Sequence, residues 1–143
     1  MQGKILTFYL QGELFGIDIR LVKEINRKIK YTVVPGAPDF IVGLFNMRGQ
    51  IVTVFDLARR IHGKPGDISL NPTCIILKNE DNSIEHLGFV VDRPGDVIDV
   101  EEEWCEPMPG NIQHIDGQYI KEVIKLEDQL IMLIDPEKIF DYL

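Results

Sequence analysis

The chain lacks the features of several common protein classes. Its apolar runs, at 74–77, 87–91 and 130–134, are far shorter than the about 20 residues that a membrane-spanning helix needs. The first residues carry one lysine before a short apolar segment at 5–10, which is too short for a secretory signal. We therefore expect a cytoplasmic protein that does not insert into the membrane.

Basic residues are also scarce. The chain has 15 Lys and Arg against 23 Asp and Glu, which gives a net charge of −8. Lys and Arg give proteins non-specific affinity for nucleic acid by neutralising phosphates, so a protein of this charge is repelled. We therefore expect no nucleic-acid partner. The excess acid is read mainly as a solvated surface, with electrostatic selection of a partner as the alternative.

Residues that carry out nucleophilic or metal chemistry are few and scattered. Cys74 and Cys105 form no C-x-x-C motif and follow no secretion signal, so we expect both to be reduced. The serines lack the G-x-S-x-G setting, and the histidines lack the spacing of metal ligands. These residues are Ser69, Ser83, His62, His86 and His114. The sequence predicts no catalytic residue, no metal site and no cofactor.

Carboxylates are plentiful, which makes any one of them weak evidence for catalysis. Six lie between residues 96 and 106, but they lack the spacing and the glycine of a calcium loop. A solvated acidic edge is the preferred interpretation, because runs of like charge usually face water. A small β enzyme that uses a carboxylate pair as acid and base remains the alternative from a different class.

Short segments that alternate in polarity or run apolar between turn signals predict a mainly β fold. We expect strands at 4–10, 14–19, 31–34, 43–47, 50–55, 73–78, 84–91, 96–100, 119–126 and 130–135, with turns at 80–83 and 92–95. The tight turn at Arg48 and Gly49 suits a two-residue hairpin, because glycine supplies a positive φ.

Short helices are expected at three places. Leu21, Val22 and Ile25 have helical spacing, which predicts one or two turns across 19–26 with Asp18 as the cap. Asp56 is expected to cap a helix at 57–62. Pro136 is expected to begin a third helix, whose apolar face is formed by Ile139, Phe140 and Leu143.

A weak internal repeat relates the two halves of the chain. An offset of 79 aligns residues 50–56 with 129–135, and an offset of 72 aligns 16–17 with 88–89. Such a period predicts two similar small β-barrels, in approximate halves 1–65 and 72–143, with terminal segments that cross over. Each half alone has a marginal core, so we expect a shared packed seam, which is also a candidate binding groove.

One segment carries a family resemblance. Residues 34–57 read V-P-G-A-P-D-F-I-V-G-L-F-N-M-R-G-Q-I-V-T-V-F-D-L. They resemble the signature of CheW-like domains, roughly V-P-x-x-P-x-x-I-x-G-x-x-N-L-R-G-x-I-V-P-V-x-D-L. Residues 8–19 and 22–25 resemble that family's opening hairpin and helix, and 88–92 resemble its G-x-V-V-D strand. Met47 stands for the usual Leu and Thr53 for the usual Pro. The resemblance covers nearly the whole chain.

The resemblance implies a fold and a role. The fold would be a single domain over 1–143 made of two five-stranded SH3-like β-barrels packed side by side. The role would be that of a non-enzymatic adaptor in bacterial chemosensory signalling. Its partners would be the cytoplasmic tip of methyl-accepting chemotaxis receptors and the regulatory domain of the histidine kinase CheA, in receptor arrays at the inner membrane.

The resemblance also implies contact residues. Receptor-binding positions would be Val22, Glu24, Gly43, Cys74 and Val97. Asn46, Arg48 and Gly49 would serve the assembly of receptor and kinase. Several have a structural alternative: core packing for Val22, a close backbone approach at Gly43, strand packing at Cys74 and Val97, and ties to neighbouring loops for Arg48.

Two related roles stay open at this point. A CheV-type adaptor would need a receiver domain after Leu143. An adaptor of a pilus or another non-flagellar chemosensory pathway would share the same residues.

Overall fold

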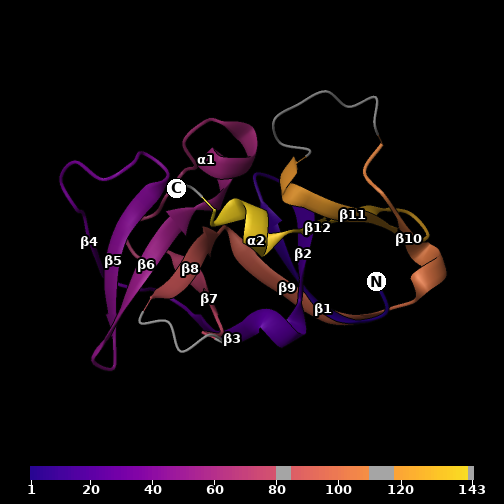
Figure 1. Cartoon of the computed structure of the whole chain (residues 1–143), viewed down its shortest axis with the longest axis horizontal. Coiled ribbons are helices and arrows are strands. Elements are labelled where there is room, and N and C mark those ends of the chain that lie inside the picture. The colour runs from indigo at the N-terminus through magenta and orange to yellow at the C-terminus, as the bar shows by residue number, and fades with distance from the viewer. Residues whose placement is uncertain (80–84, 110–117, 142–143) are drawn as a thin grey trace.

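The computed structural model describes residues 1–79, 85–109 and 118–141. Strands dominate it, and the helices are short (Figure 1). The elements are β1 (Gly3–Leu10), β2 (Glu13–Asp18), η1 (Ile19–Leu21), β3 (Val22–Asn26), β4 (Tyr31–Thr32), β5 (Ile41–Met47), β6 (Gln50–Asp56), α1 (Leu57–His62), β7 (Thr73–Leu77), β8 (His86–Val91), β9 (Arg93–Val100), η2 (Glu102–Trp104), β10 (Cys105–Glu106), β11 (Ile120–Lys125), β12 (Leu130–Ile134) and α2 (Pro136–Ile139). The turn expected at 80–83, the start of the strand at residue 84, and the expected role of Leu143 lie outside the described residues. No described helix is both long enough and apolar enough to span a bilayer.

The described strands form two six-stranded sheets. The first sheet has the order β10-β11-β12-β2-β1-β9, and the second has the order β3-β7-β8-β6-β5-β4. In each sheet one edge strand, β10 or β4, has two residues and the other five strands have five or more. The prediction of a mainly β protein with two similar units and a few short helices is confirmed.

The two sheets are equivalent strand by strand. Each contains one parallel pair, β12 with β2 in the first sheet and β6 with β8 in the second. A hairpin lies on one side of each pair: β11 with β12, and β5 with β6. The repeat segments 50–56 and 129–135 contain the strands β6 and β12, and each strand leads into a short helix. The weak repeat in the sequence therefore marks a repeat of structure.

The boundary between the sheets does not follow the two halves of the chain. The N-terminal hairpin β1–β2 lies in the first sheet with β9 to β12, while β3 to β8 form the second sheet. The chain crosses between the sheets after Asp18 and again at Asp92, so each sheet combines strands from both halves of the chain. Hydrogen bonding decides this arrangement: β1 pairs with β9 over most of its length.

Two local predictions are wrong. Only Ile19–Leu21 of the helix expected at 19–26 is helical, and Val22–Asn26 is a strand that pairs with β7. A helix of one or two turns gains little by itself, whereas pairing supplies backbone hydrogen bonds along the strand. The turn expected at 92–95 is also shorter, because Arg93 and Pro94 already pair with β1.

Other local predictions are confirmed. The side chain of Asp18 accepts a hydrogen bond from the Arg20 amide at the start of η1. Asp56 caps α1, accepting from the amide of Arg59 at 3.1 Å. Pro136 occupies the first turn of α2, although Asp135 makes no side-chain cap bond there.

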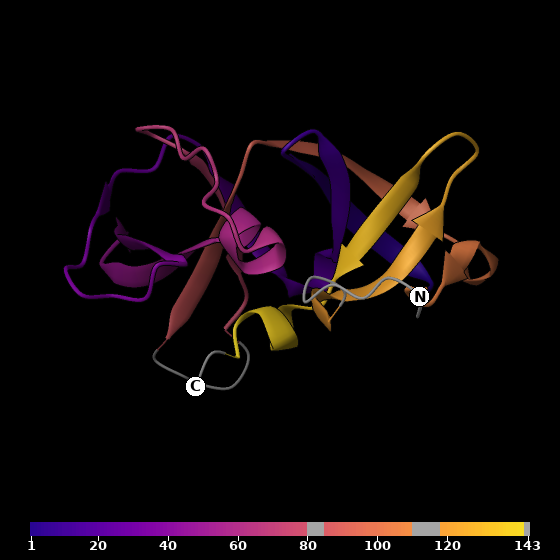
Figure 2. The ribbon, with the colours of Figure 1, turned by 90° about the horizontal axis from the view of Figure 1, so that it is seen from above.

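The largest hydrophobic cluster lies between the sheets. Phe8 and Phe15 from the first sheet pack with Phe89 from the second, and α1 and α2 add residues to the same cluster. Figure 2 shows both helices in the middle of the molecule, over the junction of the sheets. Each sheet also encloses a smaller cluster of its own. The predicted shared seam is therefore the main core of the protein.

Strands beside the seam are buried on both faces. In β7, Cys74 and Ile76 point into the second sheet's own cluster, whereas Ile75 points into the seam. Successive side chains of a strand point to opposite faces, so a strand between two cores must be apolar throughout. This explains why the sequence of β7 is an apolar run instead of an alternating one.

Candidate functional site

The hairpin β5–β6 ends in a turn with two left-handed residues. Arg48 has a φ of 52° and Gly49 a φ of 87°, the pattern of a two-residue hairpin turn. The side chain of Asn46 accepts a hydrogen bond from the Gly49 amide at 3.0 Å. Asn46 and Gly49 therefore shape the turn and leave Arg48 at its tip.

Arg48 binds a strand that is distant in the sheet order. Its Nη2 lies 2.8 Å from Oε2 of Glu24 on β3. Beside this pair, Lys23 Nζ lies 3.5 Å from the side-chain oxygen of Gln50. Since β3 is three steps from β6, the strands would lie about 14 Å apart in a flat sheet. These contacts, with a cluster that joins Met47 of β5 to β7, indicate that the sheet is curled.

The ion pair is exposed, and it shifts the pKa of both partners. The Arg48 side chain is 67% exposed and that of Glu24 is 28% exposed. Hydrogen bonding from Arg48 lowers the pKa of Glu24, and the bond to Glu24 raises the pKa of Arg48. Both groups therefore stay charged at neutral pH. The remaining donors of the planar guanidinium can still bind a carboxylate or carbonyl group of another molecule.

Three of the predicted contact residues are buried. Val22 lies in the seam cluster, and Cys74 is fully buried in the second sheet. Burial raises the pKa of the Cys74 thiol to about 12. A Cβ built on Gly43 would lie 2.3 Å from the carbonyl oxygen of Thr32. The structural alternatives for these positions, core packing and close backbone approach, therefore describe their surroundings.

Val97 lies apart from the other predicted site residues. It belongs to β9 at the edge of the first sheet, whereas the other seven belong to the second sheet or to its hairpin turn. Its side chain is 50% exposed, and its register partner is Leu6 on β1. The fold thus brings Glu24, Asn46, Arg48 and Gly49 to one place and leaves Val97 elsewhere.

The seam opens into a cleft at one end. This cavity of about 980 Å³ has walls from both sheets, with Leu77 and Leu87 on the second sheet and Leu133 on the first. Phe140, which follows α2, also lines it, and Leu21 of η1 does so from another side. The described part of the seam is packed by the large hydrophobic cluster, and this opening lies at its end. Sequence patterning could not locate it, because its walls come from six separate segments.

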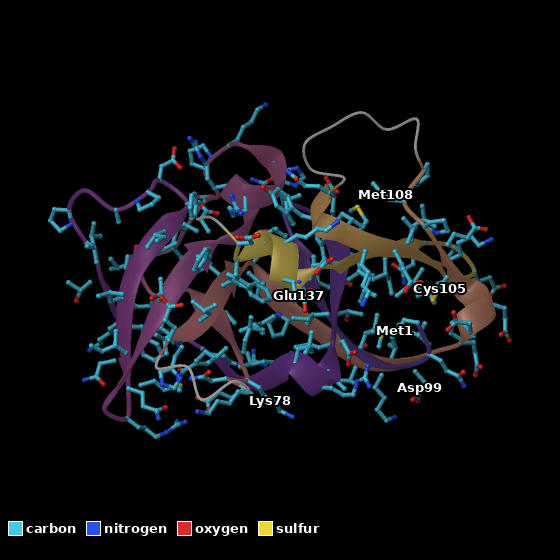
Figure 3. All side chains as sticks on the ribbon, viewed as in Figure 1. Met1, Lys78, Asp99, Cys105, Met108 and Glu137 are labelled. Carbon is cyan, nitrogen blue, oxygen red and sulfur yellow. The ribbon has the colours of Figure 1, made fainter. Side chains whose placement is uncertain are left out.

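Charged side chains line the cleft together with the apolar ones. Lys78, which follows β7, and Glu137 of α2 both line it, and Figure 3 labels these two residues. Asp18 and Arg20 form an ion pair on the same lining, with Arg20 Nη2 2.6 Å from Asp18 Oδ2. The hydrogen bonds from Arg20 lower the pKa of Asp18. A general acid needs the opposite shift, so this carboxylate does not favour the alternative of a carboxylate enzyme.

A partly exposed face of the second sheet continues the cleft. Leu87, Thr53 and Leu44 are register partners across β8, β6 and β5, so their side chains lie in one row. This row points away from the buried Val52 and Val54, and so does Ile51, which is 61% exposed. We call Leu44, Ile51, Thr53 and Leu87 the shelf. It extends from the cleft toward the hairpin turn that carries Arg48.

Residues 4–143 match the family model described as the CheW-like domain. The chain belongs to the CheW-like domain family. Relatives include Chemotaxis protein CheW of Bacillus subtilis, which is 31% identical over 138 residues, or 96% of this chain and 86% of the relative. Chemotaxis protein CheW of Treponema pallidum is 32% identical over 143 residues, which cover 97% of this chain and 82% of that protein.

A solved structure agrees with the family. The crystal structure of the scaffolding protein TtCheW from Thermoanaerobacter tengcongensis superposes with a TM-score of 0.84 at 32% identity. The match covers 99% of this chain and 94% of that chain. The resemblance read from residues 34–57 is thereby confirmed. The CheW-like family and these relatives support a role as a chemotaxis adaptor, which is a scaffold and not a catalyst.

Proposed function

We propose that the protein couples methyl-accepting chemotaxis receptors to the histidine kinase CheA. It would bind the cytoplasmic tip of a receptor and the regulatory domain of the kinase, in the cytoplasm and in arrays at the inner membrane. The protein then contributes coupling free energy between its partners and no chemistry of its own. Holding both partners in a fixed geometry lets the conformation of the receptor change the output of the kinase.

The observation that carries this proposal is the cleft and the shelf that continues it. An α-helix with its side chains is about 10–12 Å across, and an amphipathic helix binds by placing its apolar side on an apolar surface. The cleft has apolar and charged side chains in its lining, so it offers such a helix surfaces for both of its sides. A helical receptor tip placed there would contact both sheets at once. Leu77, Leu87 and Ile51 would receive its apolar side, and charged residues such as Lys78 and Glu137 would meet its polar side.

The hairpin turn suits a second partner. Arg48 is exposed at its tip and is oriented by Glu24, so a partner meets a guanidinium that is already positioned. A planar guanidinium binds a carboxylate through two parallel hydrogen bonds, which gives specificity as well as affinity. We assign this turn, with Asn46 and Gly49 as its supports, to the assembly of receptor and kinase.

The buried positions act indirectly in this proposal. Val22, Gly43 and Cys74 keep the second sheet packed, and substitution there would disturb binding by changing the shape of the sheet. Val97 is exposed on the other sheet, so it remains a proposed receptor contact in its own right. Contact and packing effects therefore need separate measurements of binding and of stability.

A pull-down of the receptor signalling fragment and CheA tests the proposal. Arg48→Ala and Glu24→Ala should each weaken the ternary assembly, whereas Arg27→Ala, which removes the same charge from another exposed position, should not. Undiminished assembly with both site variants would overturn the site. Absence of binding by the wild-type protein would overturn the function.

A second pair of variants tests the shelf. Ile51→Ser should weaken binding of the receptor fragment, because it removes an exposed apolar side chain from the proposed footprint. Leu70→Ser is the matched control, since Leu70 is 85% exposed and lies outside the shelf. Equal receptor affinity in the two variants would remove the shelf from the site. Repeating the assay with receptors and kinases of pilus or other non-flagellar systems distinguishes those pathways.

A further inference from the structure

Helix α2 belongs to one sheet by sequence and packs on the other. It follows β12 of the first sheet, and the next residue, Phe140, contacts aromatic rings of the second sheet. The centroid of the Phe140 ring lies 4.6 Å from that of Phe55 in an edge-to-face arrangement, and 6.3 Å from that of Phe89. The C-terminal segment therefore crosses the seam.

Arg60 of α1 holds the end of this segment. Its Nε donates to the carbonyl oxygen of Ile139 at 2.8 Å. Its Nη2 lies 3.4 Å from the carbonyl oxygen of Lys138 and 3.3 Å from that of Asp141. The last carbonyls of a helix have no partner within the helix, and an arginine can satisfy them. One guanidinium thus binds the last two carbonyls of α2 and a third carbonyl two residues beyond the helix.

The same guanidinium is placed by aromatic rings from both sheets. Its carbon atom lies 4.7 Å from the ring centroid of Phe40, which precedes β5 of the second sheet. It lies 5.0 Å from the ring centroid of Tyr119, which precedes β11 of the first. Arginine stacks favourably on aromatic faces, so these rings orient the fork toward α2.

Helix α2 depends on such contacts from outside. It has four residues, and the N-cap residue before it, Asp135, makes no side-chain cap bond. A single helical turn is not stable by itself in water. Yet Pro136 and Glu137 of α2, and Phe140 after it, line the cleft. The shape of the cleft on this side therefore depends on the contacts that hold α2 in place.

We propose that Arg60 is a positioning residue that latches α2 to α1 and thereby sets the shape of the cleft. Its effect on binding rests on the proposed function, but its effect on α2 does not. Removing the fork releases residues 135–141 while both sheets keep their own cores. The neighbouring Arg59 provides a matched comparison, because it lies on the same helix and pairs with Asp39 instead.

Hydrogen exchange measured by mass spectrometry on the full chain tests the latch. In the native helix the amides of Ile139 and Phe140 bond to the carbonyls of Asp135 and Pro136. Arg60→Ala should speed exchange of peptides spanning 135–141 by about tenfold, because local opening is governed by local contacts. Arg60→Lys keeps the charge but not the fork and should give a smaller increase. Arg59→Ala should leave this segment within about twofold of wild type.

The opposing results are distinct. Wild-type exchange of 135–141 in Arg60→Ala would overturn the latch, and so would an equal acceleration in β6 and β8, which would mean general destabilisation. If Arg60→Ala does not fold, Arg60→Lys carries the same test.

Affinity for the receptor signalling fragment then tests the effect on the cleft. It should fall by about tenfold in Arg60→Ala and stay unchanged in Arg59→Ala, if the wall of the cleft forms part of the site. Faster exchange with unchanged affinity would overturn the claim that the latch shapes the cleft. Failure of the wild-type protein to bind would instead overturn the proposed function, and the exchange result would still decide the latch.

Discussion

Glu24 and Arg48 share one exposed ion pair, so the charge state of Glu24 affects the folded state. Because Arg48 lowers the pKa of Glu24 in the folded protein, ionised Glu24 favours folding. This contribution is present above the ordinary pKa of 4.5 and is lost as the pH falls through the lower folded value. It is small, since exposed pairs are screened by water and salt.

We predict that Glu24→Gln is less stable than wild type at neutral pH. The difference in the free energy of unfolding between the two proteins should shrink as the pH falls below about 4.5. Urea midpoints of the two proteins, measured from neutral to acid pH at low salt, check this. The same series in an Arg48→Ala background should show no such trend, because the partner is gone. A pH-independent difference between wild type and Glu24→Gln would contradict the role of the ion pair.

A substitution of Gly43 that adds only a Cβ atom tests how closely the strands of the second sheet pack. In Gly43→Ala the new Cβ would overlap the carbonyl oxygen of Thr32, so β4 must move away from β5. We expect the free energy of unfolding to fall by about 1–3 kcal/mol, the usual cost of overpacking. Val33→Ala, at a residue that is 67% exposed, is the control and should change little. An unchanged urea midpoint in Gly43→Ala would contradict this prediction, because it would show that β4 can move away from β5 without loss of stability.

The sequence predicts the residues of the hairpin turn at the candidate site, but it does not predict which strand the turn contacts. The turn at Arg48 and Gly49 is local, so its residue types predict it. The partner of Arg48 lies 24 residues earlier on another strand, and only the curl of the sheet brings the two together. Likewise nothing in the sequence near Cys74 shows that its sulfur fills the space beside Gly88.

At the scale of elements, α1 and α2 begin at equivalent positions of the repeat but differ in their caps. Asp56 accepts from the amides of Arg59 and Gly66, whereas Asp135 makes no cap bond with its side chain. We predict that Asp56→Ala lowers the free energy of unfolding by about 2 kcal/mol, the upper range for a helix cap. Asp135→Ala should cost less. Urea unfolding checks both, and equal losses would contradict the difference in capping.

Elements with local signals were predictable, and elements decided by pairing were not. The hairpin β5–β6 and the helix α1 follow from turn residues and from one cap. The segment 22–26 has helical spacing in Val22 and Ile25, yet it pairs with β7 as a strand. Tertiary hydrogen bonds outweigh a spacing pattern that covers fewer than two turns.

At the scale of the whole molecule, we expect the shared seam to make the two sheets unfold as one cooperative unit. Trp104 is the one tryptophan of the chain and precedes β10 of the first sheet, whereas Ile75 lies on β7 of the second sheet with its side chain in the seam. We predict that Ile75→Val lowers the stability reported by Trp104 fluorescence by about 1 kcal/mol. Circular dichroism should give the same midpoint. An unmoved fluorescence midpoint would show that the sheets unfold separately.

The crossing of the chain between the sheets also belongs to this scale. The repeat indicates two like units, but similarity of strands does not state which of them pair. The placement of β1 and β2 beside β9 and β12 follows from the three-dimensional arrangement alone. This crossing places the first and last strands, β1 and β12, in one sheet, and both sheets contribute walls to the cleft.

The most direct test of the central claim is the composition of the complex with both partners. Analytical ultracentrifugation of the full chain with a receptor signalling fragment and CheA should show one species that contains all three proteins. In the same assay Ile51→Ser should lose the receptor fragment more than the kinase, and Arg48→Ala should weaken the assembly of all three. Binding of neither partner by the wild-type chain, or mutual exclusion of receptor and kinase, would contradict an adaptor with two binding surfaces.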